Sequence, residues 1–208
     1  MENENVKIFN KLSESYENCW RKDKKGKKRI EKIVRNFGLK KGMKVVEPGC
    51  GMGEFTPFIL KKTGKGGVVY AIDVSDKMLK HAKENLKNHK NVKFYNCCAS
   101  NMPVKDNEMD AVVAFNSFPH FFPKEKFIKE FYRVLKDGGL LIITHDLPGE
   151  KINRIHKNAG FNMKKNFLPN RGEMFKMLVK NGFAIKKYEN RGHYFLKAVK
   201  NGNYKSGR

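Results

Sequence analysis

The feature that most constrains this chain is the stretch from residue 45 to residue 55, V-V-E-P-G-C-G-M-G-E-F, where an apolar strand runs into glycines at alternate positions. The glycines are Gly49, Gly51 and Gly53, and Glu47 ends the strand before them. Glycine has no Cβ atom, so a backbone built this way can press against a ligand, and a helix is expected to follow at once. The stretch therefore predicts a site for a nucleotide-sized molecule in an α/β fold.

The spacing of the glycines argues against two common nucleotide sites. A dinucleotide fingerprint, G-x-G-x-x-G, needs its third glycine where this chain has Glu54. The phosphate-binding loop G-x-x-x-x-G-K-[ST] does not occur in the sequence. Neither NAD nor a phosphate bound by such a loop is therefore the expected ligand.

The E-x-G-x-G-x-G pattern resembles motif I of the class I S-adenosylmethionine-dependent methyltransferases. Twenty residues beyond Gly53, a second apolar run ends on Asp73, where that family places the carboxylate that binds both ribose hydroxyls. A carboxylate accepts two hydrogen bonds at once, and it would repel the 2′-phosphate of NADP. The resemblance covers roughly residues 5–200 and implies that S-adenosylmethionine is the cofactor.

Short apolar runs alternate with helical stripes along the chain, which indicates a parallel sheet. The predicted strands cover residues 43–47, 68–72, 92–96, 111–115, 140–144, 183–188 and 192–199. The predicted helices cover residues 24–37, 54–62, 75–88, 124–135, 149–158 and 171–181, and Ser75 is the expected N-cap of its helix. The class is α/β, and the resemblance implies a Rossmann-like, seven-stranded, mostly parallel sheet. Its expected order is 3-2-1-4-5-7-6, with the last strand antiparallel and helices on both faces.

The length of 208 residues suits one α/β domain. We predict a helical arm or lid over residues 1–40, a cofactor-binding methyltransferase domain over residues 41–200 and a polar tail over residues 201–208. In the resembled family an aromatic residue of the arm closes over the cofactor, and Tyr16 matches that position. Packing of Tyr16 against the domain is the alternative.

The resemblance also assigns cofactor contacts at the strand ends, where open parallel sheets bind their ligands. Met78 is expected to cover the adenine. The full set of predicted cofactor residues is Tyr16, Glu47, Gly49, Cys50, Gly51, Asp73, Val74, Met78, Cys98, Ala99, Ser100, Phe115 and Asn116.

The end of the third strand departs from the family. Similar members carry an Asp that accepts from the adenine amino group, whereas this chain has Cys98 there, so the backbone at Ala99, with help from Ser100, is expected to hold the adenine. The pair Cys97 and Cys98 also fits a soft-metal site, but small buried cysteines are the expectation and no metal is predicted. With Cys19 and Cys50, these make four cysteines without a C-x-x-C motif, so reduced thiols are expected.

The end of the fourth strand reads F-N-S-F-P-H and lacks the [ND]-P-P-[YF] motif of methyltransferases that act on base amino groups. It resembles the corresponding loop of small-molecule methyltransferases, where a His faces the acceptor. His120, His145 and His156 are therefore the candidate catalytic residues, with His145 favoured because it ends the fifth strand. Histidine suits a base at neutral pH, and a surface or capping role is the alternative. The spacing of these histidines is no known metal-ligand pattern.

The formal charge of +23 resembles that of a nucleic-acid-binding protein. Only eight of the 44 basic residues are Arg, however, and Arg is the residue that binds phosphate and base edges bidentately. We read the Lys excess as compositional and the basic run over residues 21–29 as a solvated face, with an anionic-surface patch as the alternative.

The expected function is transfer of a methyl group from S-adenosylmethionine to a small-molecule acceptor. An RNA methyltransferase and a non-catalytic basic binding protein are the alternatives, so nucleic acid is an allowed but not favoured partner. No apolar run reaches the ~20 residues that cross a bilayer, and the first five residues do not resemble a signal peptide. A cytoplasmic monomer or homodimer without membrane contact is the expectation.

Overall fold

The structure is a computed structural model that describes residues 24–159, 161–162 and 164–202. The predicted arm before residue 24, with Tyr16 and Cys19, lies outside the described residues, and so do residues 203–208 of the predicted tail. None of the helices formed by the described residues is long and apolar enough to cross a membrane.

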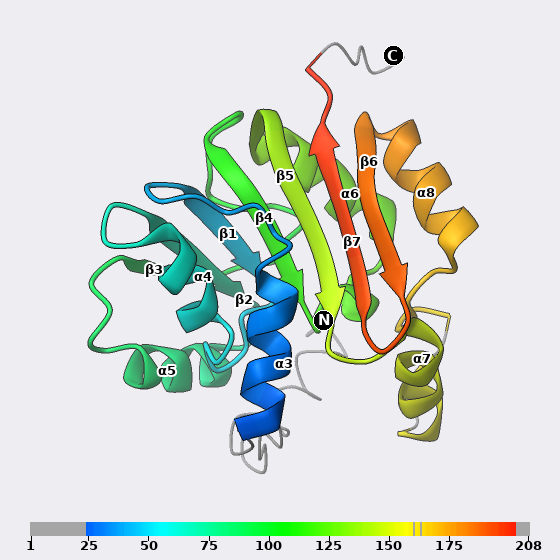
Figure 1. Ribbon diagram of the computed structural model, residues 1–208, viewed down its shortest axis with the longest axis horizontal. Coiled ribbons are helices and arrows are strands. Elements are labelled where there is room, and N and C mark those ends of the chain that lie inside the picture. The colour runs from blue at the N-terminus through cyan, green and yellow to red at the C-terminus, as the bar shows by residue number, and fades with distance from the viewer. Residues whose placement is uncertain (1–23, 160, 163, 203–208) are drawn as a thin grey trace. The chain divides into compact units, whose positions relative to one another are not determined.

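Seven strands form one sheet in the order β3-β2-β1-β4-β5-β7-β6 (Figure 1). β1 pairs with β2, β2 with β3, and β4 with β5, all in parallel, whereas β7 runs antiparallel to both β5 and β6. This arrangement confirms the predicted α/β class, the strand order and the antiparallel last strand. The chain's contacts divide it into two compact units, residues 1–99 and 100–208, which are described in turn. The predicted boundaries at residues 41 and 200 stay a prediction.

The described residues of the first unit, 24–99, form three parallel strands and three helices. They are α3 (Lys24–Val34), β1 (Lys44–Pro48), α4 (Thr56–Thr63), β2 (Val68–Asp73), α5 (Asp76–Asn85) and β3 (Val92–Asn96). Val45, Val69 and Val92 lie in register across the three strands, and the first two are fully buried. The helix after β1 begins at Thr56, two residues later than predicted, because the glycine turn extends through Gly53.

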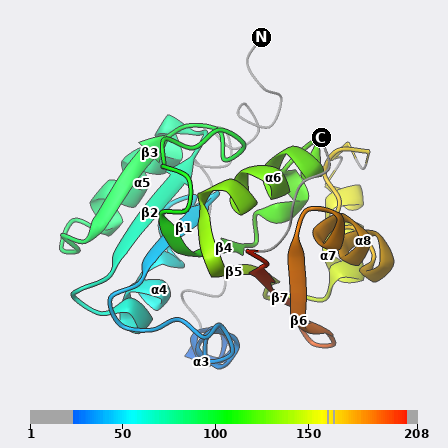
Figure 2. The ribbon, with the colours of Figure 1, turned by 90° about the horizontal axis from the view of Figure 1, so that it is seen from above.

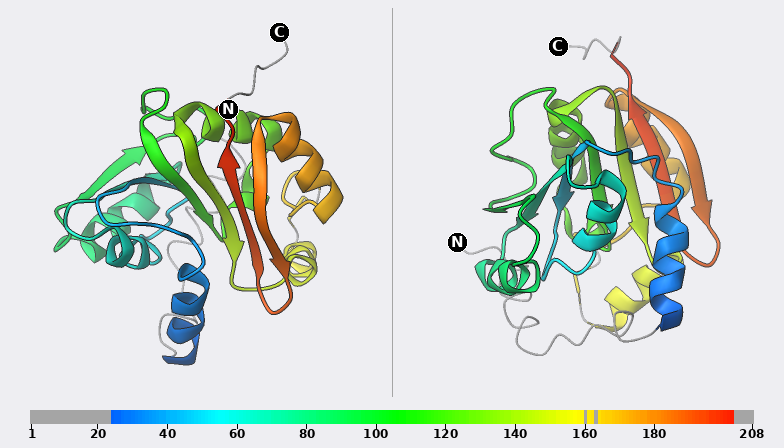
Figure 3. Two further views of the ribbon diagram at one scale, coloured as in Figure 1. Left: turned by 45° about the horizontal axis from the view of Figure 1, so that its top comes forward. Right: turned by 60° about the vertical axis from the view of Figure 1, so that its left-hand side comes forward.

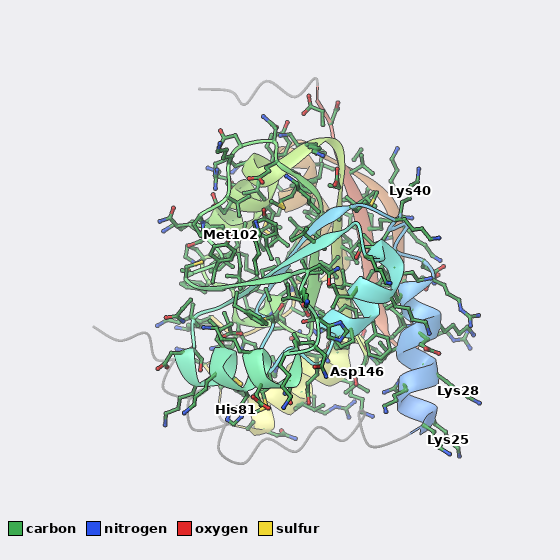
Figure 4. The ribbon with its side chains drawn as sticks, turned by 90° about the vertical axis from the view of Figure 1, so that its left-hand side faces the viewer. Lys25, Lys28, Lys40, His81, Met102 and Asp146 are labelled. Atoms are coloured by element: carbon green, nitrogen blue, oxygen red, sulfur yellow. The ribbon has the colours of Figure 1, made fainter. Side chains whose placement is uncertain are left out.

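Helix α3 packs on α4 through a narrow apolar stripe (Figures 1 and 2). Ile30 and Ile33 are buried, the Phe37 ring lies 6.0 Å from the Phe55 ring in a tilted arrangement, and Lys61 Nζ donates to Glu31 at 2.9 Å. The other face of α3 is basic and exposed, and Figure 4 shows Lys25 and Lys28 projecting from the helix.

In the second unit, the residues that the structure describes form four strands, a short 3-10 turn and three α-helices. They are β4 (Met109–Phe115), η1 (Phe118–His120), α6 (Lys124–Val134), β5 (Leu135–His145), α7 (Gly149–Asn158), α8 (Arg171–Lys180), β6 (Phe183–Asn190) and β7 (Tyr194–Lys200). Figure 2 shows α8 lying along β6, and Figure 3 shows the β6–β7 hairpin beside β5. Gly192, with φ of 78°, makes the tight turn of that hairpin.

The predicted start of the fifth strand at residue 140 is wrong. Strand β5 begins at Leu135, which pairs with Met109 of β4, and the register then shifts before Ala111 pairs with Leu140. Residues 136–139, K-D-G-G, which precede the predicted strand, are therefore a bulge within the observed strand, where Gly138 adopts a positive φ of 76°. A bulge and a turn share the same glycine signal, so the sequence alone does not separate them.

A buried ion pair ties the segment after residue 100 to helix α6. Glu130 accepts from the Met102 amide at 2.6 Å and from two nitrogens of Arg133 at 2.7 and 2.8 Å. Arg133 also donates to the Val104 carbonyl at 2.8 Å. The pair thus satisfies backbone groups that would otherwise lose their partners on burial.

We expect Glu130→Ala to lower the free energy of unfolding by about 2–4 kcal/mol, because it leaves a half-buried guanidinium and a buried amide without their acceptor. Glu125→Ala, in the same helix, removes an exposed pair with Lys180 and a hydrogen bond with Asn181, and it should cost under about 1 kcal/mol. Urea unfolding of both variants measures the difference, and equal losses would show that burial of the Glu130 network does not matter.

Candidate functional site

The Asp73 carboxylate joins the glycine turn after β1 to the start of α5. Its Oδ2 accepts from the Gly51 amide at 2.8 Å, and its Oδ1 accepts from the Ser75 amide at 2.9 Å. The amides of Gly49 and Cys50 donate to the Ile72 carbonyl at 2.8 and 3.0 Å. The turn is therefore fixed against the carboxyl end of β2.

Ser75 begins helix α5 as predicted. It has an extended backbone, and its hydroxyl accepts from the Met78 amide at 3.1 Å, which confirms the expected N-cap. Because Asp73 binds the Ser75 amide, the carboxylate lies within one residue of the helix N-terminus. The partial positive charge of a helix N-terminus stabilises such a negative group.

The glycines of the turn have different surroundings. Gly51 has φ of +54°, and a Cβ atom there would meet no other atom within 4 Å, so its outer side is open. Gly53 has φ of +74°, but a Cβ atom there would lie 2.6 Å from Cδ1 of Leu86 and 3.2 Å from Cβ of Ala82. Gly51 thus leaves room for a ligand at an ordered amide, whereas Gly53 lets α5 pack against the turn.

Glu47 lies beneath the turn as a buried acid. It is 2% exposed, and its Oε2 accepts from the Thr56 hydroxyl at 2.6 Å. Burial raises the pKa of Glu47 to about 8, although the bond from Thr56 opposes the shift. Glu47 is therefore mostly protonated at neutral pH, and its predicted contact with the cofactor stays a prediction.

The other predicted cofactor residues of the first unit surround the same strand ends. Cys50 is buried against Ala71 and Leu79, and burial raises the pKa of its thiol. Met78 is buried, 5% exposed, and Val74 is half-buried. These positions carry apolar or backbone contacts rather than charges.

The cysteine pair after β3 differs from expectation. Cys97 is half-buried and Cys98 is exposed, so the prediction of small buried cysteines is wrong for Cys98. The reason is that β3 lies at the end of the strand order and only one of its neighbours shields it. Ala99 is buried, as a backbone contact requires. Within the described part of the chain, no three His, Cys, Asp or Glu side chains lie where they could share a metal ion.

Three predicted cofactor residues belong to the second unit. Ser100 is half-buried, and Phe115, at the end of β4, is 8% exposed. Asn116 is exposed with φ of 51°, and its side-chain oxygen accepts from the Asp146 amide at 3.2 Å. The structure thus uses Asn116 to join the ends of β4 and β5, and its contact with the cofactor stays a prediction.

The second unit brings the three candidate histidines together. The rings of His120 and His156 lie 4.8 Å apart, and each lies about 5 Å from the Phe161 ring, at 5.2 and 5.1 Å. His145 is close enough to both for their charges to affect its ionisation. We call His120, His145 and His156 the histidine cluster.

His145 is the most deeply buried member of the histidine cluster. It is 2% exposed and pairs across the strands with Tyr194 of β7, whose ring lies 5.9 Å away in an edge arrangement. Neither His145 Nε2 nor the Tyr194 hydroxyl has a hydrogen-bond partner among the described residues, although both are buried. Buried polar atoms are normally satisfied, so a ligand group that bonds to them would stabilise this site.

Burial keeps the histidine cluster uncharged at neutral pH. It lowers the pKa of His145 to about 3 and that of His120 to about 4, and it also lowers the pKa of His156. The bonds from Asn166 oppose the shifts at His120 and His156 without reversing them. The histidine cluster therefore presents neutral imidazoles to whatever it binds.

Two residues of this site carried no signal in the sequence. Lys124 is 7% exposed, donates to the carbonyls of Pro119 and Phe121 at 3.1 Å each, and reaches the Lys165 carbonyl at 3.2 Å. Asn166 bonds to both His120 and His156. Both were missed because their partners are backbone groups or lie far along the chain.

Comparison with known proteins finds sequences and structures that are similar to this chain. A family model described as a methyltransferase domain matches residues 46–143. Demethylmenaquinone methyltransferase of Staphylococcus aureus (strain MRSA252) is 31% identical over 139 residues, which are 65% of this chain and 53% of that protein. The chain thus spans about half the length of the curated relatives it matches, 53% for this one.

Solved structures agree with this family. An S-adenosylmethionine-dependent methyltransferase from Aquifex aeolicus is 25% identical, with a TM-score of 0.72 over 93% of this chain and 97% of that chain. A methyltransferase in complex with the Haloferax volcanii Trm112 methyltransferase activator is 14% identical, with a TM-score of 0.76 over the same shares, 93% and 97%. The second likeness is one of fold alone.

The open side of Gly51 generates a prediction about ligand binding. Gly51→Ala should weaken S-adenosylmethionine binding at least tenfold, because the new methyl group occupies the open side, while the positive φ costs stability by about 1–2 kcal/mol. Gly53→Ala is the control. Its new methyl group would press on the Leu86 side chain inside the protein, so it should lower the free energy of unfolding by more than Gly51→Ala does. Calorimetry measures cofactor binding, and urea unfolding measures stability. Normal cofactor binding by Gly51→Ala would contradict the account.

Burial of Glu47 predicts a pH dependence of stability. Folding raises the pKa of Glu47 from 4.5 to about 8. The stability that this shift gives the folded protein is therefore fully present below pH 4.5 and is lost as the pH rises towards 8. Glu47→Gln should therefore become more stable relative to the wild type across this window, by at most about 1.4 kcal/mol per pH unit. Unfolding in urea at pH 5 and pH 8 tests this, and parallel pH profiles would contradict it.

Proposed function

We propose that this chain, which belongs to the class I S-adenosylmethionine-dependent methyltransferases, transfers a methyl group to a small-molecule acceptor. The observation that carries the cofactor assignment is the Asp73 carboxylate, ordered by two backbone amides beside the open side of Gly51. The acceptor assignment depends on the histidine cluster.

The Asp73 carboxylate has the capacity to bind a ribose. Two carboxylate oxygens offer about four lone-pair positions, and the backbone amides of Ser75, Gly51 and Val74 bond to this carboxylate. The lone-pair capacity that remains can accept hydrogen bonds from the ribose hydroxyls. When bound, S-adenosylmethionine supplies a methyl group on a positively charged sulfur.

The histidine cluster suits an uncharged acceptor. Methyl transfer is mainly a matter of alignment, and a base is needed only where the accepting atom carries a hydrogen. His145, whose pKa is about 3, holds a proton poorly, so we assign it to orienting the acceptor through Nε2. His156 is less buried and is the better candidate for receiving a proton.

The relatives support a small acceptor. The Staphylococcus aureus proteins are named for methylation of demethylmenaquinone, which is a small molecule. The assignment of S-adenosylmethionine to this chain's own residues, the cytoplasmic location and the monomeric or dimeric state remain predictions.

RNA is the second candidate acceptor, and the exposed basic face of α3 favours it. Lys24, Lys25, Lys27 and Lys28 are all exposed there. Against it stand the low share of Arg and the F-N-S-F-P-H sequence after β4. We therefore expect RNA to bind weakly and with a steep salt dependence.

Transfer of labelled methyl groups distinguishes the candidates. The chain is incubated with labelled S-adenosylmethionine and, in parallel, with fractionated metabolites and with RNA. We expect label in a metabolite fraction and none in RNA. Label in RNA at physiological salt would reject the small-molecule acceptor, and absence of S-adenosylmethionine binding would reject the methyltransferase assignment.

We expect His145→Gln to lower turnover by about 10- to 100-fold while leaving S-adenosylmethionine affinity unchanged, since His145 is assigned to the acceptor. His81→Gln is the matched control, because His81 is exposed on α5 (Figure 4) and should change neither quantity. A His145 variant that loses cofactor affinity, or one with normal turnover, would contradict the assignment.

A further inference from the structure

The buried ammonium of Lys124 joins two segments of the second unit that lie far apart in the chain. Nζ donates to the carbonyls of Pro119 and Phe121 at 3.1 Å each, and to the carbonyl of Lys165 at 3.2 Å. The first two carbonyls belong to the turn after β4, and the third belongs to the segment between α7 and α8. An ammonium carries three hydrogens, so these three bonds use its full donor capacity.

The two segments that Lys124 joins determine where His120 and His156 lie. His120 is on the turn, between the two carbonyls that accept from Nζ. Asn166 directly follows Lys165, and its side-chain and backbone oxygens lie 3.0 Å from Nδ1 of His120 and of His156, respectively. The two rings lie 4.8 Å apart. A clamp between the two segments therefore fixes the spacing of these rings.

The charge of Lys124 is compensated by backbone and aromatic groups. Burial lowers its pKa to about 8, which leaves the ammonium mostly charged at neutral pH. Among the described residues, no acidic side chain forms an ion pair with Lys124, but the ring centroids of Phe167 and Phe118 lie 4.6 and 5.8 Å from Nζ. A neutral side chain of similar length would fill the same space and remove the donor from all three carbonyls. The ammonium, rather than the bulk of the side chain, therefore explains why Lys stands at this position.

We infer that Lys124 is a positioning residue that clamps the turn of His120 to the segment of Asn166, and so sets the spacing of the His120 and His156 rings at which the methyl acceptor is aligned. The part that concerns the acceptor rests on the proposed function, whereas the clamp does not. The bond between Asn166 and His120 also joins the two segments, but it links neutral groups, and bonds from a charged donor are about twice as strong. Because Nζ uses its hydrogens on protein carbonyls, Lys124 acts on the acceptor through the histidines and not by contact.

Exchange of the ammonium hydrogens tests the clamp in the wild-type protein. In NMR spectra at neutral pH, the Nζ hydrogens of Lys124 should exchange slowly with water and show Overhauser contacts to the Phe167 ring, because they are buried and bonded. Lys126, exposed on the same helix, is the internal control, and its Nζ hydrogens should exchange too fast to detect. A Lys124 ammonium that exchanges as fast as that of Lys126 would overturn the inference. This measurement needs no variant, so it decides the question even where a substitution prevents folding.

Three variants separate the ammonium from the rest of the side chain. Lys124→Met keeps the length of the side chain and removes every donor, so Overhauser contacts between the rings of His120 and His156 should weaken. Lys124→Arg keeps a charge and several donors, and it should retain more of these contacts than Lys124→Met does. Lys126→Met is the matched control and should leave the ring contacts unchanged. Unchanged ring contacts in Lys124→Met, or equal losses in Lys124→Met and Lys124→Arg, would overturn the inference.

Turnover tests the link between the clamp and the acceptor. The variants are incubated with labelled S-adenosylmethionine and with the metabolite fraction that takes up label in the presence of the wild type. Misplacement of an aligning group lowers a rate by up to about 100-fold, so we expect Lys124→Met to lose about 10- to 100-fold in turnover and to keep its S-adenosylmethionine affinity. Lys124→Arg should recover part of the lost turnover, and Lys126→Met should lose none.

The outcomes separate the clamp from the proposed function. Normal turnover in a Lys124→Met protein whose ring contacts are weakened would reject the link to the acceptor. A confirmed clamp in a chain that methylates no metabolite fraction would reject the proposed function and leave the clamp intact.

Discussion

The hydrogen bonds of the Asp73 carboxylate are the interaction on which the proposed cofactor site of the first unit depends. The carboxylate satisfies the amides of Gly51 and Ser75, so it fixes the glycine turn and the start of α5 with one side chain. Burial raises the pKa of Asp73 even though backbone hydrogen bonds from Ser75, Gly51 and Val74 oppose the shift. Burial of the Asp73 carboxylate costs desolvation free energy. A ligand that bonds to its remaining lone pairs would explain why an acid stands at this position.

The histidine cluster of the second unit depends on a different constraint, which is the burial of ionisable groups without charge. His120 and His145 have pKa values of about 4 and 3, and burial lowers the pKa of Lys124 to about 8. The Lys124 ammonium is compensated by three carbonyls and lies 4.6 Å from the Phe167 ring. The buried positive charge is thus carried by Lys124, which orders the backbone around it, and the histidine cluster stays neutral.

Local signals in the sequence predict the helices and strands. They do not predict contacts between segments that lie far apart in the chain. Ser75 as an N-cap is confirmed, because a few neighbouring residues determine it. The bulge near Gly138 depends on pairing with β4, and Asn166 meets His120 across 46 residues of chain. Such contacts leave no local pattern, so the histidines were found by residue type while their partners were not.

The most direct test of the central claim is a crystal structure of the chain with S-adenosylhomocysteine. The account predicts both ribose hydroxyls within hydrogen-bonding distance of the Asp73 carboxylate, with the bonds from Gly51 and Ser75 still in place. Ribose hydroxyls held by other groups, with Asp73 bonded only to the two amides, would contradict it and reduce Asp73 to a structural cap of the turn.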